Sequence, residues 1–178
     1  QSLWYDEGNT AYMTLRDVGG IVRATADDIH PPGYYLAVTG WTQLVGRSEF
    51  ALRGFSALIG VILVAVVYRI AKVTWGSVTA VFAAVVAAIH PALVYYSQEA
   101  RMYMLASMLG AVLIAVAPGM FRDYAQKGRS KRWCAYVLVS IGGLYTHYIF
   151  LFVLVATNLW VACEIVINRK NWPLRNML

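Results

Sequence analysis

Two adjacent carboxylates, Asp6 and Glu7, stand near the start of a chain that is otherwise mostly apolar. A carboxylate beside a membrane cavity can take the proton from an acceptor hydroxyl or amine, and a second one can orient that acceptor or hold a metal ion. We therefore take Asp6 and Glu7 as candidate catalytic residues. A divalent metal on this pair is an open alternative, and no other cofactor is indicated. The structural alternative is a solvated acidic loop.

Two arginines could hold an anionic part of a substrate. Arg53 precedes a long apolar run, and Arg101 ends the short polar segment 97–101 between two apolar runs. A guanidinium can bind a phosphate through two parallel hydrogen bonds, so both arginines and the neighbouring Glu99 are candidate substrate-binding residues. The structural alternatives are anchoring at the membrane interface for Arg53 and an internal ion pair between Glu99 and Arg101.

Three further side chains are candidates for substrate binding. His30 lies between Asp27-Asp28 and a proline pair, and a protonated imidazole there can bind a phosphate. Tyr103 begins an apolar run, and His147 interrupts another. A structural hydrogen bond is an equal alternative for His30, while the two aspartates before it are more typical of a solvated turn or a helix cap.

The composition is that of a membrane protein. Of the 178 residues, 60% are apolar and 13% are charged, and the mean hydropathy is +0.56. Soluble domains are about half apolar and about a quarter charged. The net charge of +6 comes from basic residues at the ends of apolar runs rather than from one patch with interleaved aromatics. This distribution argues against nucleic-acid binding and for a role in membrane topology.

Residues 1–53 form the polar part of the chain. We expect a short helix over 11–18, which Gly19-Gly20 would end, and a second helix over 31–46, which a proline pair would begin. The second helix is shorter than the ~20 residues that cross a bilayer, and its tyrosines and tryptophan suit the membrane interface. We therefore expect two interfacial helices in this loop.

Residues 54–178 form the membrane part. Apolar runs predict spans over 54–71, 75–96 and 102–121. The run from Trp133 to Cys163 is also uncharged, but a single helix of that length would reach ~46 Å, against a hydrocarbon core of ~30 Å. We expect it to break near Gly142-Gly143 and Thr146-His147 into spans 133–146 and 148–167. The predicted fold class is therefore an all-α integral membrane protein with about five transmembrane helices.

Charge predicts the orientation of these spans. One face of the predicted bundle carries ten basic residues and two acids; the basic ones lie in the connection that holds Arg69 and Lys72 and in residues 122–132 and 169–175. The opposite face carries five basic and seven acidic residues. The more basic face belongs in the cytoplasm. Every candidate site residue then lies on the non-cytoplasmic side.

The polar segments also resemble a known family. The segments WYDEG, DDIHPPGYYL, SEFALRGFSALIG, YYSQEARMYML and LYTHYIF occur here in the order seen in bacterial membrane glycosyltransferases of family 39, which include the protein O-mannosyltransferase and lipid A aminoarabinose transferase types. The resemblance covers nearly the whole chain. It implies the C-type glycosyltransferase fold, a polyprenyl-phosphate sugar donor, and inverting transfer on the non-cytoplasmic face of the bacterial plasma membrane.

The resemblance also implies roles for single residues. Asp6 would be the catalytic base with Glu7 assisting, and the phosphate and substrate site would include Arg53, Glu99 and Arg101. The aminoarabinose type often has a lysine before the proline pair, where this chain has His30. The mannosyltransferase type has an aspartate a few residues after the arginine of the turn, where this chain continues with Tyr103. Family members are usually longer, so we expect this chain to be part of a longer protein.

These observations predict a membrane glycosyltransferase that moves a sugar from a polyprenyl-phosphate donor to a lipid, glycan or protein acceptor. Asp6 would deprotonate the acceptor, and Arg53 or Arg101 would meet the phosphate. One alternative is a flippase or transporter of lipid-linked sugars, which would need no base at Asp6. A purely structural subunit is another, and it would tolerate changes at Asp6, Glu99 and Arg101 together. The sugar and the acceptor do not follow from the sequence.

Overall fold

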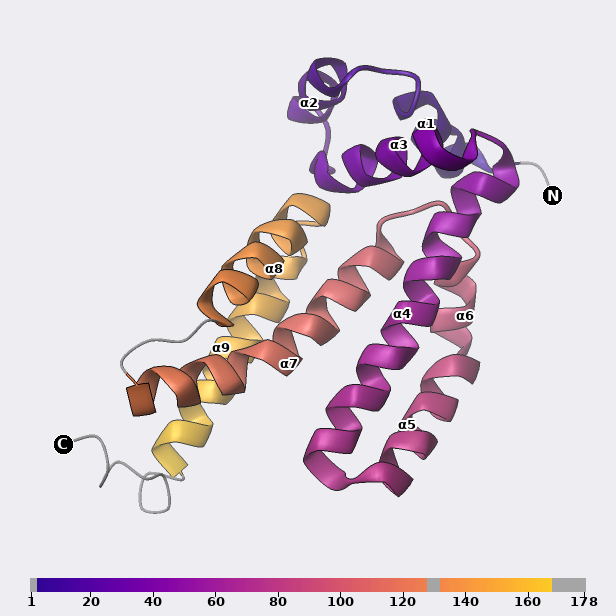
Figure 1. Ribbon diagram of the computed structural model, residues 1–178. Helices are drawn as coiled ribbons and strands as arrows, with labels where there is room; N and C mark the ends of the chain where they lie inside the picture. The colour runs from indigo at the N-terminus through magenta and orange to yellow at the C-terminus, as the bar shows by residue number, and fades with distance from the viewer. Residues whose placement is uncertain (1–2, 128–131, 168–178) are drawn as a thin grey trace.

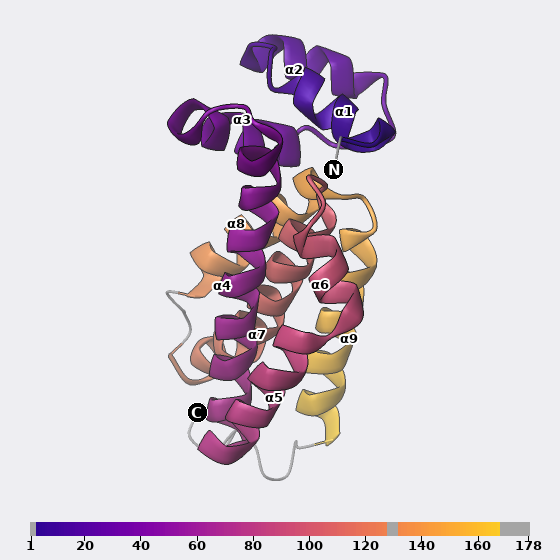
Figure 2. The ribbon, with the colours of Figure 1, turned by 90° about the vertical axis from the view of Figure 1, so that its right-hand side faces the viewer.

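Helices make up all regular secondary structure in the residues that the computed structural model describes, 3–127 and 132–167. Helices α1 to α3 lie across one end of the molecule, and α4 to α9 form a bundle beneath them (Figures 1 and 2). This arrangement confirms the predicted all-α class. The basic segment 169–175 and part of the basic linker 122–132 lie outside the described residues.

The first layer holds one helix more than the two that we expected. Helix α1 spans Tyr5–Met13, and α2 spans Val18–Ala26. The predicted helix over 11–18 was wrong, because Asp17 begins a helix at this point. Its carboxylate accepts a hydrogen bond of 2.9 Å from the Gly20 amide, so the glycine pair lies in the first turn of α2 rather than ending a helix.

Helix α3 spans Gly33–Val45, close to the predicted 31–46. Tyr34 and Tyr35 are fully buried, so they are core residues and not the interfacial tyrosines that we expected. They join a core cluster that connects the first layer to the bundle, formed by Met13, Ile21, Tyr34, Tyr35, Val38, Leu52, Ala100 and Met102. Any side chain at Gly33 would overlap the Tyr145 carbonyl, so this glycine lets α3 approach the end of α8.

Helix α4 spans Glu49–Trp75. Ser48 caps it through a hydrogen bond of 3.1 Å from the Ala51 amide to the Ser48 hydroxyl. The helix therefore begins five residues before the predicted span of 54–71, and Arg53 lies in its second turn. Trp41 of α3 donates a hydrogen bond of 2.8 Å to the Ala51 carbonyl, which holds α3 against the start of α4.

The predicted span 75–96 is a bent pair of helices. Helix α5 spans Ser77–Ile89 and α6 spans Pro91–Ser97, with an angle of 58° between them. Pro91 explains the break, because a proline disfavours the helical conformation at the residue before it and lacks the amide hydrogen that would continue the helix. The bend directs the short loop 98–102 toward the first layer.

The remaining helices are α7 over Tyr103–Lys127, α8 over Arg132–Thr146 and α9 over Phe150–Ile167. The long uncharged run breaks between α8 and α9, where Thr146-His147 predicted it. Gly142-Gly143, the other predicted mark, lies inside α8. A side chain at Gly143 would overlap the Phe150 ring, so this glycine serves the packing of α9 on α8.

Length and composition allow α4 and residues 103–120 of α7 each to cross a membrane, and the bent pair α5–α6 passes the same test when its two helices are taken together. Residues 150–164 of α9 are apolar but form a shorter stretch. Many large apolar side chains of the bundle are exposed, including Val61, Phe82, Ile89, Leu138 and Phe152. Such a surface suits lipid rather than water. The chain is an all-α membrane protein, and the count of five spans stays a prediction.

Candidate functional site

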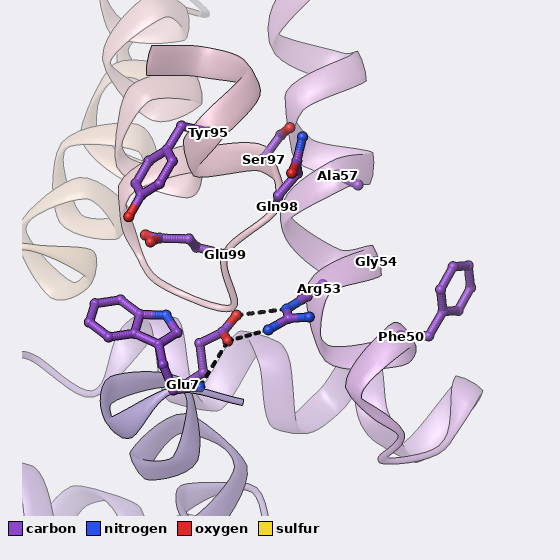
Figure 3. A pocket seen from close by; sticks show the side chains of 10 residues that line it. Glu7, Phe50, Arg53, Gly54, Ala57, Tyr95, Ser97, Gln98 and Glu99 are labelled. Carbon is purple, nitrogen blue, oxygen red and sulfur yellow. Dashed lines mark hydrogen bonds and ion pairs between the residues drawn. The ribbon is translucent and has the colours of Figure 1, made fainter. Parts of the chain in front are cut away.

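Glu7 lies at the centre of a buried set of hydrogen bonds (Figure 3). Only 1% of Glu7 is exposed. Arg53 donates to both of its oxygens, from Nε to Oε1 at 2.9 Å and from Nη2 to Oε2 at 2.6 Å. The Ala100 amide donates to Oε1 at 3.0 Å, and the Trp4 amide lies 3.4 Å from Oε2. One carboxylate thus connects α1, α4 and the loop before α7.

The protonation state of Glu7 follows from these contacts. Burial by itself would raise the pKa of Glu7, but the Arg53 hydrogen bond, the Ala100 amide and the charge of Arg53 together lower it below the ordinary value. Glu7 therefore stays ionised at neutral pH. Both of its oxygens already accept hydrogen bonds, which suits a residue that holds neighbouring segments in place.

Asp6 has a different environment although it is the next residue. Its side chain is 39% exposed, and its Oδ2 lies 3.8 Å from Nη2 of Arg101. The Asp6 carbonyl lies 3.4 Å from Nη1 of the same arginine. Successive residues of a helix point about 100° apart, so α1 can direct Glu7 into the protein and Asp6 toward an accessible space.

Arg101 is the centre of a second group of side chains. It is only 4% exposed, although it carries a full charge. Its Nη2 lies 3.4 Å from Nε2 of His30, and its Cζ lies 6.0 Å from the centre of the Tyr103 ring. Among the described residues, its buried Nε has no hydrogen-bond partner. A buried charged donor without a partner is costly, and an anionic ligand would relieve that cost.

Two histidines complete this group, which we call the Arg101 cluster: Asp6, His30, Arg101, Tyr103 and His147. The rings of His30 and His147 are 6.2 Å apart, and those of Tyr103 and His147 are 5.9 Å apart. Nδ1 of His30 lies 3.4 Å from Oδ1 of Asp28. Burial, His30 and Arg101 all lower the pKa of His147, which favours its neutral form. Five predicted residues thus meet, although they come from four separate parts of the chain, around residues 6, 30, 101–103 and 147.

The other three predicted residues lie on the opposite side of loop 98–102. A cavity of about 510 Å³ opens there between α4 and α6, and its lining residues are Trp4, Glu7, Phe50, Arg53, Gly54, Ala57, Tyr95, Ser97, Gln98 and Glu99. Glu99 points toward the Tyr95 hydroxyl in this cavity (Figure 3). Arg101 pairs with Asp6, so the alternative of an internal ion pair between Glu99 and Arg101 does not describe this structure.

A divalent metal on the acidic pair, which the sequence left open, finds no further ligands nearby among the described residues. Within the part of the chain that the structure describes, no group of three or more histidine, cysteine, aspartate or glutamate residues could hold a metal ion. Glu7 directs its oxygens to Arg53 and Ala100, and Asp6 faces Arg101.

Sequence reasoning missed several contributors to the site. The most important is the Ala100 amide, because no residue type marks a backbone donor. Trp4, Tyr95 and Gln98 line the cavity without having been candidates. Only their position in the sequence could have indicated a place in the site. Trp4 lies close to Asp6-Glu7, and Tyr95 and Gln98 lie beside or within the polar segment that ends at Arg101.

Comparison with known proteins identifies a family. The matching family model is described as dolichyl-phosphate-mannose-protein mannosyltransferase, and it covers residues 29–178. No curated protein and no solved structure matches the chain. The match leaves out Asp6 and Glu7 but includes the other six predicted residues, which are His30, Arg53, Glu99, Arg101, Tyr103 and His147. Because it covers well over half of the chain, the chain belongs to the dolichyl-phosphate-mannose-protein mannosyltransferase family, whose members are membrane glycosyltransferases of the C type.

Proposed function

We propose that this chain carries the catalytic base of an inverting transferase, which moves a sugar from a polyprenyl-phosphate donor to a hydroxyl or amine acceptor. The observation that supports this most strongly is the pair of Asp6 and Arg101. A partly exposed carboxylate lies 3.8 Å from a buried guanidinium, so a proton acceptor and an anion-binding group face the same space. Transfer from a phosphate-linked donor needs both groups.

Asp6 is the base in this proposal. Its carboxylate is accessible and is not saturated by donors, unlike that of Glu7. It accepts the proton of the acceptor group while the acceptor oxygen or nitrogen forms a bond to the anomeric carbon. The bond between that carbon and the phosphate oxygen breaks, and its electron pair stays on the phosphate. Attack from the face opposite the leaving group inverts the configuration.

Arg101 stabilises the leaving group. The departing lipid phosphate gains one negative charge as the glycosidic bond breaks, and a fixed cation with little access to water stabilises that charge strongly. The unpartnered Nε of Arg101 is available for such a contact. His30 lies beside the same guanidinium and supports binding of the phosphate. Arg53 has a structural role instead, because it is committed to Glu7.

The charge asymmetry of the sequence supports a site on the non-cytoplasmic face of a bacterial plasma membrane. The first layer, which contributes Asp6 and His30, belongs to the less basic side of the chain. The family description names mannose as the sugar and protein as the acceptor for its members. For this chain we propose only a polyprenyl-phosphate-linked sugar and a nucleophilic acceptor.

The test uses the protein in its native membrane with a radiolabelled polyprenyl-phosphate sugar. Wild type should release label from the lipid to an acceptor, and Asp6→Asn should not. Asp27→Asn is the matched control, because Asp27 is also an aspartate of the first layer but is exposed and outside the Arg101 cluster. Equal release by wild type and Asp6→Asn would contradict the assignment of the base. Label that stays on lipid but crosses to the other leaflet would favour a flippase.

A further inference from the structure

Arg101 is held less firmly than Arg53. Its terminal nitrogens lie 3.4 to 3.8 Å from atoms of Asp6 and His30. Arg53, in contrast, donates to Glu7 at 2.6 and 2.9 Å. A loosely held arginine binds an anion less tightly, because its rotamers must first be ordered. Strong binding of a phosphate by Arg101 therefore needs a further group that fixes the guanidinium.

Tyr35 lies beside Arg101 in the protein core. It is fully buried and belongs to the same cluster as Ala100 and Met102, the two neighbours of Arg101 in the chain. Its hydroxyl interacts with Arg101, but within the described residues neither this hydroxyl nor the Nε of Arg101 makes a hydrogen bond of good geometry. Unsatisfied polar groups are costly when they are buried. A hydroxyl and a guanidinium that could satisfy each other are thus neighbours.

The Tyr35 hydroxyl stays neutral. Burial raises the pKa of Tyr35, the charge of Arg101 lowers it, and the charges of Asp28 and Asp6 raise it, which leaves this pKa above its ordinary value. A neutral hydroxyl can accept a hydrogen bond from a guanidinium without cancelling its charge, as a carboxylate would. An arginine has five N–H donors, so a bond to Tyr35 leaves others for a phosphate.

Helix α3 presents Tyr35 from a fixed position. Near its start, the absence of a side chain at Gly33 lets the helix lie against the Tyr145 carbonyl of α8. Near its end, Trp41 donates a hydrogen bond of 2.8 Å to the Ala51 carbonyl of α4. A group on an element that is held at both ends can orient a neighbouring side chain more closely than a group on a loose loop can.

We propose that Tyr35 is a positioning residue for Arg101: its hydroxyl accepts a hydrogen bond from the guanidinium and directs the remaining N–H donors toward a bound phosphate. The inference rests on the proposed function for the identity of that phosphate, which is the phosphate of the polyprenyl-linked donor. Tyr35 therefore acts on the substrate through Arg101 and not by direct contact.

The first experiment measures anion binding without catalysis. The purified protein in nanodiscs is titrated with geranyl phosphate, a short prenyl monophosphate, and calorimetry gives the Kd, with empty nanodiscs as the blank. Tyr35→Phe should raise the Kd about tenfold or more, as expected when a hydrogen bond to a charged group is lost. Its unfolding temperature should stay close to that of wild type, because the buried ring is retained. A lower unfolding temperature with an unchanged Kd would show a structural role only and overturn the inference.

Tyr34→Phe is the matched control. Tyr34 is also a fully buried residue of α3, and its hydroxyl also lacks a hydrogen bond of good geometry among the described residues. Its main polar neighbour, however, is Ser56 of α4 rather than Arg101. This variant should bind geranyl phosphate like wild type. An equal rise of the Kd in both variants would indicate a general effect of losing a buried hydroxyl and would overturn the inference.

A double variant tests whether Tyr35 acts through Arg101. In an Arg101→Lys background, Tyr35→Phe should raise the Kd by a smaller factor than in wild type, because lysine lacks the planar fork that the hydroxyl orients. The same factor in both backgrounds would mean that Tyr35 acts independently of Arg101, which contradicts a positioning role.

The inference and the proposed function fail in different ways. A weaker binding of geranyl phosphate by Tyr35→Phe than by wild type, without any sugar transfer by wild type, would contradict only the proposed function. An active enzyme in which Tyr35→Phe changes neither this Kd nor the KM for the donor would overturn only the inference and leave the role of Asp6 in place. Absence of geranyl phosphate binding by wild type would contradict the anion site at Arg101 and the inference with it.

Discussion

The Glu7–Arg53 pair and the Asp6–Arg101 pair each join a carboxylate of α1 to a guanidinium. In the first pair, the nitrogen–oxygen distances are 2.6 and 2.9 Å, and a backbone amide adds a further donor. In the second, the charged atoms are 3.8 Å apart, and the carboxylate is partly exposed. A carboxylate saturated by donors holds segments together, whereas a loosely paired one keeps the freedom to take a proton. Neighbouring acids can therefore have opposite roles.

The largest expected effect comes from removing the proposed base, Asp6. Asp6→Asn should lower the rate of sugar transfer by about 10²–10⁴-fold, the usual contribution of a general base, while the unfolding temperature in detergent stays close to that of wild type. Transfer rate and thermal unfolding of the same preparations check this. Unfolding of the variant at a much lower temperature would remove the contrast with Glu7, because Asp6 would then also be a structural residue.

Glu7→Gln should affect mainly stability. It leaves the Arg53 guanidinium beside a neutral amide and weakens the contact to Ala100. Breaking a buried pair costs about 3–5 kcal/mol, and the partly exposed Arg53 reduces this to about 2–4 kcal/mol. Denaturant unfolding in micelles measures the loss. A double variant, Glu7→Gln with Arg53→Gln, should be less destabilised than the sum of the single changes. Additive losses would mean that the two side chains do not act as a pair.

Arg101→Lys should reduce kcat/KM by about 10–100-fold, because lysine keeps the charge but lacks the planar fork that can contact two oxygens. The loss should appear with the phosphate-linked donor and not in the KM for the acceptor. Arg47→Lys is the control, since Arg47 is exposed in the loop before α4. An equal loss in both variants would indicate a general effect of losing arginine rather than a role of the Arg101 cluster.

The smallest effect is a pH dependence of stability that comes from Glu7. Its pKa is lower in the folded chain than the ordinary value of 4.5, so the unfolded chain binds this proton more readily. The stabilisation is therefore fully present above about pH 4.5, and it is lost as pH falls through the folded pKa. Wild type should lose stability below pH 4.5 more steeply than Glu7→Gln. Parallel curves would contradict the ionised state of Glu7.

Much of the fold follows from local pattern. Apolar runs of sufficient length predicted helices that the structure forms as α4, α7, α8 and α9, and the excess length of the run from Trp133 predicted the break at His147. The first layer was harder to predict. Asp17 serves as a cap for α2, which put Gly19-Gly20 inside a helix, and a tyrosine pair that suited the interface became part of the core. Capping and burial there depend on neighbours from other segments.

For the candidate site too, the sequence predicted one part and not another. The order of the polar segments and their resemblance to a glycosyltransferase family singled out all eight candidate residues before any geometry was known. Their grouping did not follow from spacing. Glu99 and Arg101 are two positions apart, yet the first lines the cavity and the second lies in the Arg101 cluster. The loop between them is held by a side chain more than ninety residues earlier in the chain.

The sequence by itself determined the membrane class, the helical runs, the family and the set of candidate site residues, because these depend on composition and on local order. Only the tertiary structure decided that Glu7 is bound to Arg53 while Asp6 remains accessible. The same applies to the meeting of His30, Arg101 and His147 from distant segments. Hydrogen bonding, burial and charge pairing are properties of groups in contact, and in this chain those contacts join residues far apart in sequence.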